Sequence, residues 1–132
     1  MRMQVSKVYR VSLDGSSSDS SVFELSGNLS EWLFSVGFWR SFNLRHGTMF
    51  DQFEEDEADT KTVSAVATAF ANLIRSIEAK QPETIQFVYR HLSDGTTISA
   101  TVEKAELLTE IRSMHDFLVH AVEMKSTLTF AL

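Results

Sequence analysis

The segment from residue 84 to residue 102 constrains the fold most, because it has the pattern of a β-hairpin. Two runs rich in β-branched and aromatic residues, Thr84 to Leu92 and Thr96 to Val102, flank the dipeptide Asp94-Gly95. That dipeptide is typical of a two-residue type I′ turn, which would pair Tyr89 with Ala100. One predicted face then consists of Ile85, Phe87, Tyr89, Ile98, Ala100 and Val102. The opposite face consists of Gln86, Arg90, Thr97, Ser99 and Thr101.

Two segments with helical periodicity enclose this hairpin. Asp59 to Lys80 has apolar residues every three or four positions and stops before Pro82, and Glu103 to Lys125 has a similar pattern. The back of the first helix has only one charged residue among Ser64, Ala65, Thr68, Asn72, Arg75, Ser76 and Ala79. A solvated helix face usually has more charge. We therefore expect that face to be covered by residues 14–59 or by a second copy, which makes helix 59–80 a candidate homodimer interface.

Both ends of the chain have strand patterns. Near the N-terminus, Val5, Lys7, Tyr9, Val11 and Leu13 alternate with Gln4, Ser6, Val8, Arg10 and Ser12. The first set would form the inner face of a half-buried strand, where Lys7 is a misfit. Residues 22–25 and 127–132 are further short strands. The predicted order βαββαβ is ferredoxin-like: a single α+β domain, residues 1–132, with an antiparallel sheet and two main helices on one face. Residues 14–59 are then a large insertion after the first strand. The alternative is a different sheet order in which this insertion contributes one or two strands.

The insertion has three distinct parts after a polar loop, residues 14–21. Asn28 and Glu31 resemble a capping box that begins a short helix over residues 29–36. Seven of the 14 aromatic residues follow between positions 32 and 53, with Gly37 and Gly47 as predicted turn points. These rings suit either burial against the sheet and long helix or a pocket or protein interface. An acidic run then precedes the long helix.

Charge and composition narrow the function. Six acids and no base lie within residues 51–59, whereas the chain as a whole has a net charge of −6. The chain has no cysteine, no glycine-rich phosphate loop, no G-x-S-x-G motif and no H-E-x-x-H motif, so we expect no catalytic residue, cofactor or metal site. The excess of acidic over basic residues argues against nucleic-acid binding. No apolar run is long enough to span a membrane and no signal peptide is visible, so a cytoplasmic location is expected.

We predict a protein-binding module that uses aromatic anchors beside an acidic patch against a basic partner. The predicted partner-binding residues are Trp39, Arg40, Arg45, His46, Glu54, Glu55, Asp56 and Glu57. In physical character, a small acidic chain without cysteine resembles an inhibitor or immunity-type protein that neutralises a basic toxin. The alternative is a small-ligand-binding domain, with or without enzymatic activity, in which Arg40 or Arg45 holds an anion. Its predicted pocket residues are Trp39, Phe42, Tyr89 and His91.

Overall fold

The computed structural model describes residues 3–10 and 22–132, so the predicted loop over residues 14–21 lies outside the described part. That part is an α+β fold with four helices and antiparallel sheets. The strands are β1 (Ser6–Arg10), β2 (Val22–Leu25), β3 (Glu55–Ala58), β4 (Thr84–His91), β5 (Thr97–Glu103) and β6 (Leu128–Ala131). The helices are α1 (Gly27–Ser35), α2 (Phe38–His46), α3 (Thr60–Lys80) and α4 (Lys104–Glu123). The helices and strands outside residues 38–58 lie close to the predicted positions.

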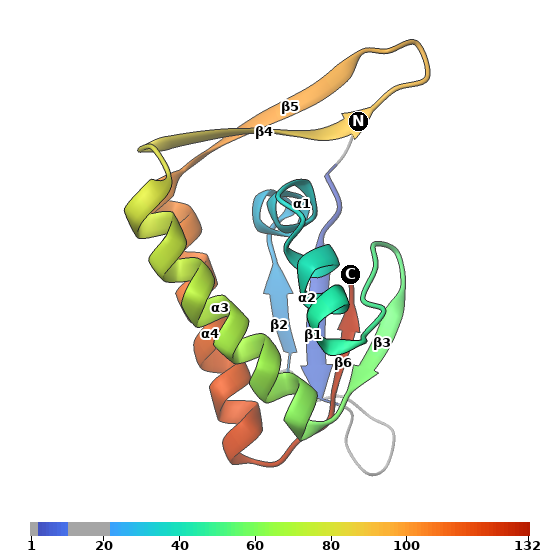
Figure 1. The fold of residues 1–132 in the computed structure, drawn as a ribbon, viewed down its shortest axis with the longest axis vertical. Helices are drawn as coiled ribbons and strands as arrows, with labels where there is room; N and C mark the ends of the chain where they lie inside the picture. The colour runs from blue at the N-terminus through green and yellow to red at the C-terminus, as the bar shows by residue number, and fades with distance from the viewer. Residues whose placement is uncertain (1–2, 11–21) are drawn as a thin grey trace.

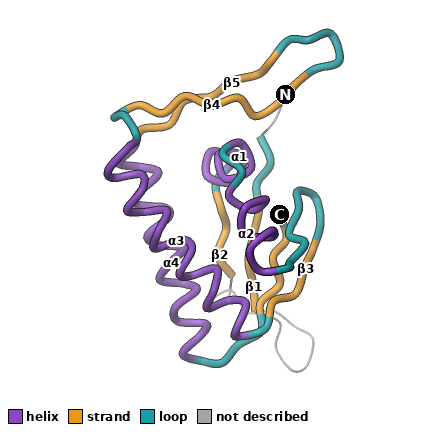
Figure 2. The backbone as a smooth tube through the Cα atoms, viewed as in Figure 1, coloured by secondary structure: helices purple, strands orange, loops and turns teal. Residues whose placement is uncertain are grey.

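The sheet order corrects the predicted ferredoxin-like arrangement. The main sheet has the order β2-β1-β6-β3, and the β4–β5 hairpin is a separate two-stranded sheet. Residues 14–59 therefore contribute two strands, which was the alternative arrangement. The hairpin lies across one end of the molecule, beyond the ends of α3 and α4 (Figures 1 and 2). β2 and β3 occupy the two positions beside the β1–β6 pair, and the hairpin pairs with neither of them.

The predicted inner face of the N-terminal strand is also reversed. Ser6 and Val8 are buried, whereas Lys7 is exposed. Val8 pairs with Phe23 on one side and with Phe130 on the other, which places all three on the core face. A strand alternates its side chains between faces, so Lys7 and Tyr9 lie on the open face. The misfit of Lys7 in the predicted pattern was the signal of this reversal.

Most aromatic residues between positions 32 and 53 belong to the core, and Phe53 is the exposed exception. Trp39 is 1% exposed, and the centroid of its ring lies 5.2 Å from that of Phe50 and 5.9 Å from that of Phe130. Phe38 stacks on Phe70 at 4.8 Å, which fixes α2 against α3. Gly37 and Gly47, both with positive φ, flank α2 as the predicted turn points. Burial of these rings is thus the interpretation that the structure supports.

The hairpin has a different turn and register from those predicted. The Gly95 N–H donates to the Leu92 carbonyl, and Gly95 alone has a positive φ in this turn. This is a three-residue loop with a left-handed glycine, not a type I′ turn, which needs two positive φ values. His91 consequently pairs with Thr97, one position from its predicted partner Ile98, and a bulge between Val88 and Arg90 increases the shift to two positions at Phe87, which pairs with Ala100. The shift of two preserves the predicted faces at Phe87, whereas the shift of one between the bulge and the loop reverses the face of Arg90.

Candidate functional site

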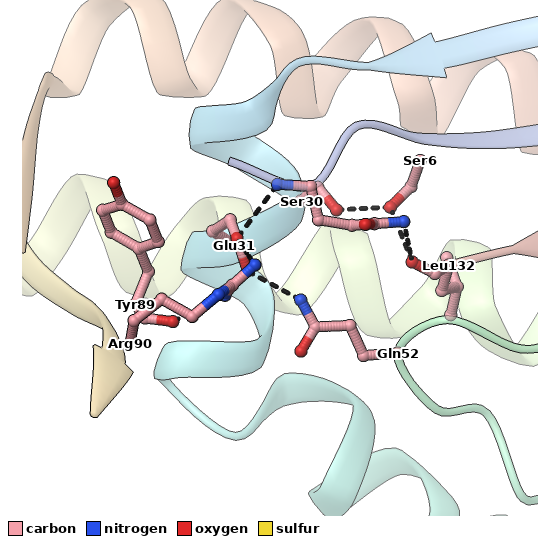
Figure 3. A network of polar contacts seen from close by, with 8 residues as sticks. Ser6, Ser30, Glu31, Gln52, Tyr89, Arg90 and Leu132 are labelled. Atoms are coloured by element: carbon pink, nitrogen blue, oxygen red, sulfur yellow. Dashed lines mark hydrogen bonds and ion pairs between the residues drawn. The ribbon is translucent and has the colours of Figure 1, made fainter. Parts of the chain in front are cut away.

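An ion pair between the buried Glu31 and the partly buried Arg90 joins the hairpin to the body of the molecule. Arg90 Nη2 lies 2.7 Å from Glu31 Oε2, and Arg90 Nη1 donates to Glu31 Oε1 at 2.9 Å (Figure 3). The bulge makes this contact possible, because Arg90 pairs with Ile98 and so lies on the same face as Ala100 and Val102. The prediction that Arg90 lies on the opposite, open face is therefore wrong.

Further hydrogen bonds connect this ion pair to both ends of the chain. The Gln4 backbone N–H and the Gln52 side-chain amide donate to the two carboxylate oxygens of Glu31, at 3.0 and 2.8 Å. The Gln4 amide and the Ser6 hydroxyl both donate to the Leu132 carbonyl (Figure 3). Four segments far apart in the sequence thus meet around one buried carboxylate. We interpret this cluster as a structural clamp.

Sequence reasoning missed the clamp because it assigned Glu31 to a capping box with Asn28. The N-cap of α1 is instead Ser26, whose hydroxyl accepts the Leu29 N–H at 3.2 Å. The Ser26 N–H and hydroxyl also donate to the Glu110 carboxylate of α4, at 2.7 and 2.6 Å. Ser26 therefore supplies the cap, and the Glu31 side chain is available for Arg90.

The face of the main sheet that is turned away from the core is acidic at both edges. Glu24, Lys7, Ala131 and Glu55 form one cross-strand row over β2, β1, β6 and β3. Val22, Tyr9, Thr129 and Glu57 form the next row. Glu24, Glu55 and Glu57 are exposed, as is Glu54 immediately before β3. These four carboxylates and Lys7 define the acidic face, which has a net charge of −3.

Two exposed apolar side chains border a hollow at one end of the acidic face. Phe53 is 70% exposed and Val5 is 60% exposed, and both line a depression of about 410 Å³. Lys7, Glu24, Glu54 and Glu55 contribute to the same lining. Phe53 also has a φ of 66°, an unusual value for a bulky residue. An exposed ring in a strained backbone conformation beside carboxylates is a candidate anchor for a cationic side chain.

Asp56 differs from its acidic neighbours because it lies on the core side of β3. It pairs with Phe130, and its Oδ2 atom is buried without a hydrogen-bond partner among the described residues. Burial raises the pKa of Asp56 above 3.8, and the nearby charge of Asp51 raises this pKa further. Of the predicted acidic patch, Glu54, Glu55 and Glu57 are thus exposed, whereas Asp56 is directed inwards.

The predicted partner-binding residues divide between the core and separate surfaces. Trp39 is buried, so its predicted use as a surface anchor must be corrected. Arg40, Arg45 and His46 are exposed on α2. Arg40 lines a hollow together with Asp51 and Glu54, whereas Arg45 and His46 line a different groove between α2 and α3. Phe53, Glu24 and Lys7 on the acidic face were not predicted as site residues. The sequence signal for Lys7 was the strand alternation, which places Lys7 and Val8 on opposite faces.

The predicted ligand pocket does not form from its four residues. Tyr89 and His91 line a hollow beside α1, with Glu31 and Gln52. Trp39 and Phe42 are buried parts of the aromatic core, and Phe42 lines a different groove between α2 and α3. The four residues are separated because Tyr89 and His91 belong to β4, which is not part of the main sheet.

No family model, curated protein or solved structure matches the chain. Among residues 3–10 and 22–132, no helix combines the length and apolar character needed to cross a membrane. In the same residues, no three His, Asp or Glu side chains are grouped so that they could hold a metal ion.

Proposed function

We propose that this chain is a non-catalytic protein-binding module that captures a basic segment of its partner on the acidic face. The observation that carries the proposal is the open sheet surface between acidic edges, with exposed Phe53 at its end. Clustered negative charge accelerates encounter with a basic partner, and the apolar rim supplies contact area once the partner has docked.

The geometry suits a lysine or arginine side chain at the hollow beside Phe53. Glu54 and Glu55 are exposed there, and a ring such as that of Phe53 attracts a cation over its face. Lys7 neutralises only part of the local charge, and its ammonium lies 5.3 Å from the centroid of the Tyr9 ring. A partner with several positive charges would compensate the remaining three negative charges.

The kind of partner that fits best is a strongly basic protein. A toxin held by an inhibitor or immunity-type protein is one such pair, and this suggestion rests on physical character alone. We also propose a cytoplasmic location.

The test is nuclear magnetic resonance mapping with a short peptide in which lysine and valine alternate. We expect shifts in β1, β2, β3 and residues 53–55, and an affinity that falls as salt is added. Combined Glu54→Lys, Glu55→Lys and Glu57→Lys substitutions should weaken binding by at least about tenfold, because they reverse the charge of the site.

A matched variant changes the net charge equally at exposed acids elsewhere: Glu83→Lys, Asp116→Lys and Glu123→Lys. It should retain most of the affinity, and a peptide with glutamine in place of lysine should not bind. Equal losses in the two variants, or shifts confined to other surfaces, would contradict the proposal.

We further propose a homodimer through α3. Ser64, Thr68, Asn72 and Ser76 remain exposed and uncharged along this helix. Sedimentation at micromolar concentration should then show a species of twice the chain mass of 14.9 kDa. A species of single chain mass at that concentration would rule out this dimer.

A further inference from the structure

A groove between α2 and α3 has the dimensions and the floor of a small-molecule site. Its volume is about 350 Å³, within the usual range for ligand pockets. The buried residues Trp32, Phe42 and Ile77 contribute to its lining, together with the partly buried Phe38 and Leu73. The groove therefore offers an aromatic and aliphatic surface to an apolar group.

The polar part of the groove is cationic although the chain as a whole is acidic. Arg45 and His46 line it, and the other polar side chains there are uncharged serine, asparagine and glutamine. No aspartate or glutamate contributes to the lining, in a chain of net charge −6. Arg45 is exposed and makes no ion pair with any carboxylate in the described part of the chain. Its charge is thus available to a ligand.

A structural role for these two basic residues accounts for only part of this arrangement. Both lie in the last turn of α2, where a positive charge stabilises the helix C-terminus. That end of a helix has about half a negative charge, so the full charge of the Arg45 guanidinium leaves a positive excess. The His46 ring packs on Phe42 with a centroid distance of 4.3 Å, which extends the aromatic lining towards the charged end.

From this combination we infer that the groove binds a small organic anion with an apolar body, such as an aromatic carboxylate or sulfonate. The apolar body would lie along the floor between Phe38 and Leu73, and the anionic group would contact Arg45. The groove would select against cations, in contrast to the acidic face. This binding site is independent of the acidic face, because the two have opposite charge and no lining residue in common. It shares Asn72 and Ser76 with the dimer face proposed on α3, so ligand and second copy would compete there.

The test uses two fluorescent probes that differ in one group. 1-Anilinonaphthalene-8-sulfonate has an aromatic body and a sulfonate, and N-phenyl-1-naphthylamine has the same body without the sulfonate. We expect the sulfonate probe to bind the folded chain with one-to-one stoichiometry. Arg45→Gln should weaken this probe by about tenfold, as expected for loss of a charge-assisted hydrogen bond, and should hardly change binding of the neutral probe.

Two control variants locate the site. Arg40→Gln removes the same charge from α2, but Arg40 does not line the groove, so both probes should bind as before. Ser76→Trp should block the groove and abolish binding of both probes, whereas Thr68→Trp, on the same helix but outside the groove, should not. Near-ultraviolet circular dichroism of each variant shows whether the tertiary fold is retained.

The inference is overturned if Arg45→Gln and Arg40→Gln weaken the sulfonate probe equally, since the charge effect would then be general. Unchanged binding to a folded Ser76→Trp variant would place the probe elsewhere. Absence of binding to the unaltered chain would also overturn it. None of these results bears on the acidic face, which is tested with a basic peptide.

Discussion

Glu31 is the residue whose environment departs most from what its type predicts. Its side chain is 1% exposed, and three groups donate to its two oxygens: Arg90, the Gln4 backbone and the Gln52 amide. A buried carboxylate without such partners would carry a large desolvation penalty. The clamp therefore couples the position of the hairpin to this ion pair, in addition to the burial of Ile85, Phe87 and Val102 in the core.

Breaking this ion pair should be strongly destabilising. Arg90→Met leaves the buried Glu31 charge without its cation, and we expect a loss of about 3 to 5 kcal/mol in the free energy of unfolding. A second substitution, Glu31→Met in the same chain, should recover much of this loss because it removes the stranded charge. Urea denaturation of the two single variants and the double variant measures the coupling.

The exposed pair of Arg112 and Glu78 is the matched control for this measurement. Its atoms are 3.4 Å apart and both side chains are half exposed. Arg112→Met should cost less than about 1 kcal/mol, as is usual for surface pairs. Similar losses in the free energy of unfolding for Arg112→Met and Arg90→Met would show that the clamp stabilises the fold no more than a surface ion pair does.

Asp56 predicts a pH-dependent stability. Its pKa in the folded chain is raised above 3.8 by burial and by Asp51, so folding retains a proton that the unfolded chain releases. Stability should therefore fall as pH rises through the window that begins near pH 3.8, and the cost persists above it. Asp56→Asn should raise Tm by about 2 °C at pH 7 and by almost nothing at pH 3.

The neighbouring exposed acid supplies the comparison for Asp56. Glu57→Gln removes one negative charge from the same strand but from its open face. Thermal melts of both variants at the two pH values separate burial of a carboxylate from relief of charge repulsion. An Asp56→Asn gain that is the same at pH 3 as at pH 7 would contradict the assignment.

At the scale of elements, the hairpin shows how local geometry redirects a side chain. Its three-residue loop sets the register, and the bulge between Val88 and Arg90 then turns Arg90 to the core side. Without the bulge, strict alternation would place Arg90 beside Gln86 on the solvent face. The clamp thus depends on one irregularity in β4.

Gly95 should be sensitive to substitution although nothing crowds it. Its φ is +91°, and no atom lies within 4 Å of the position that a Cβ atom would occupy, so any cost is conformational. We expect Gly95→Ala to lower the free energy of unfolding by about 1 to 2 kcal/mol. Gly95→Asn should cost less, because asparagine tolerates left-handed conformations. Equal losses for alanine and asparagine, measured by urea denaturation, would argue against this explanation.

At the scale of the whole molecule, two surfaces of opposite charge lie on different parts of one framework. The acidic face belongs to the four-stranded sheet, and the cationic groove lies between α2 and α3 on the core side of that sheet. The aromatic core between them, centred on Trp39, holds both in place. The acidic run was predictable from composition, but its place on an edge strand was not.

The sequence by itself determined the elements with strong local signals. The two long helices, the hairpin, the short strand over residues 22–25 and the last strand all follow from periodicity and turn residues, and Asp59 caps α3 as predicted, accepting the Thr62 N–H at 2.9 Å. Only the tertiary structure decided the sheet order, the outward face of β1 and the burial of Trp39. Those features depend on contacts between residues far apart in the chain, and a local pattern contains no information about which distant strand or ring will cover it.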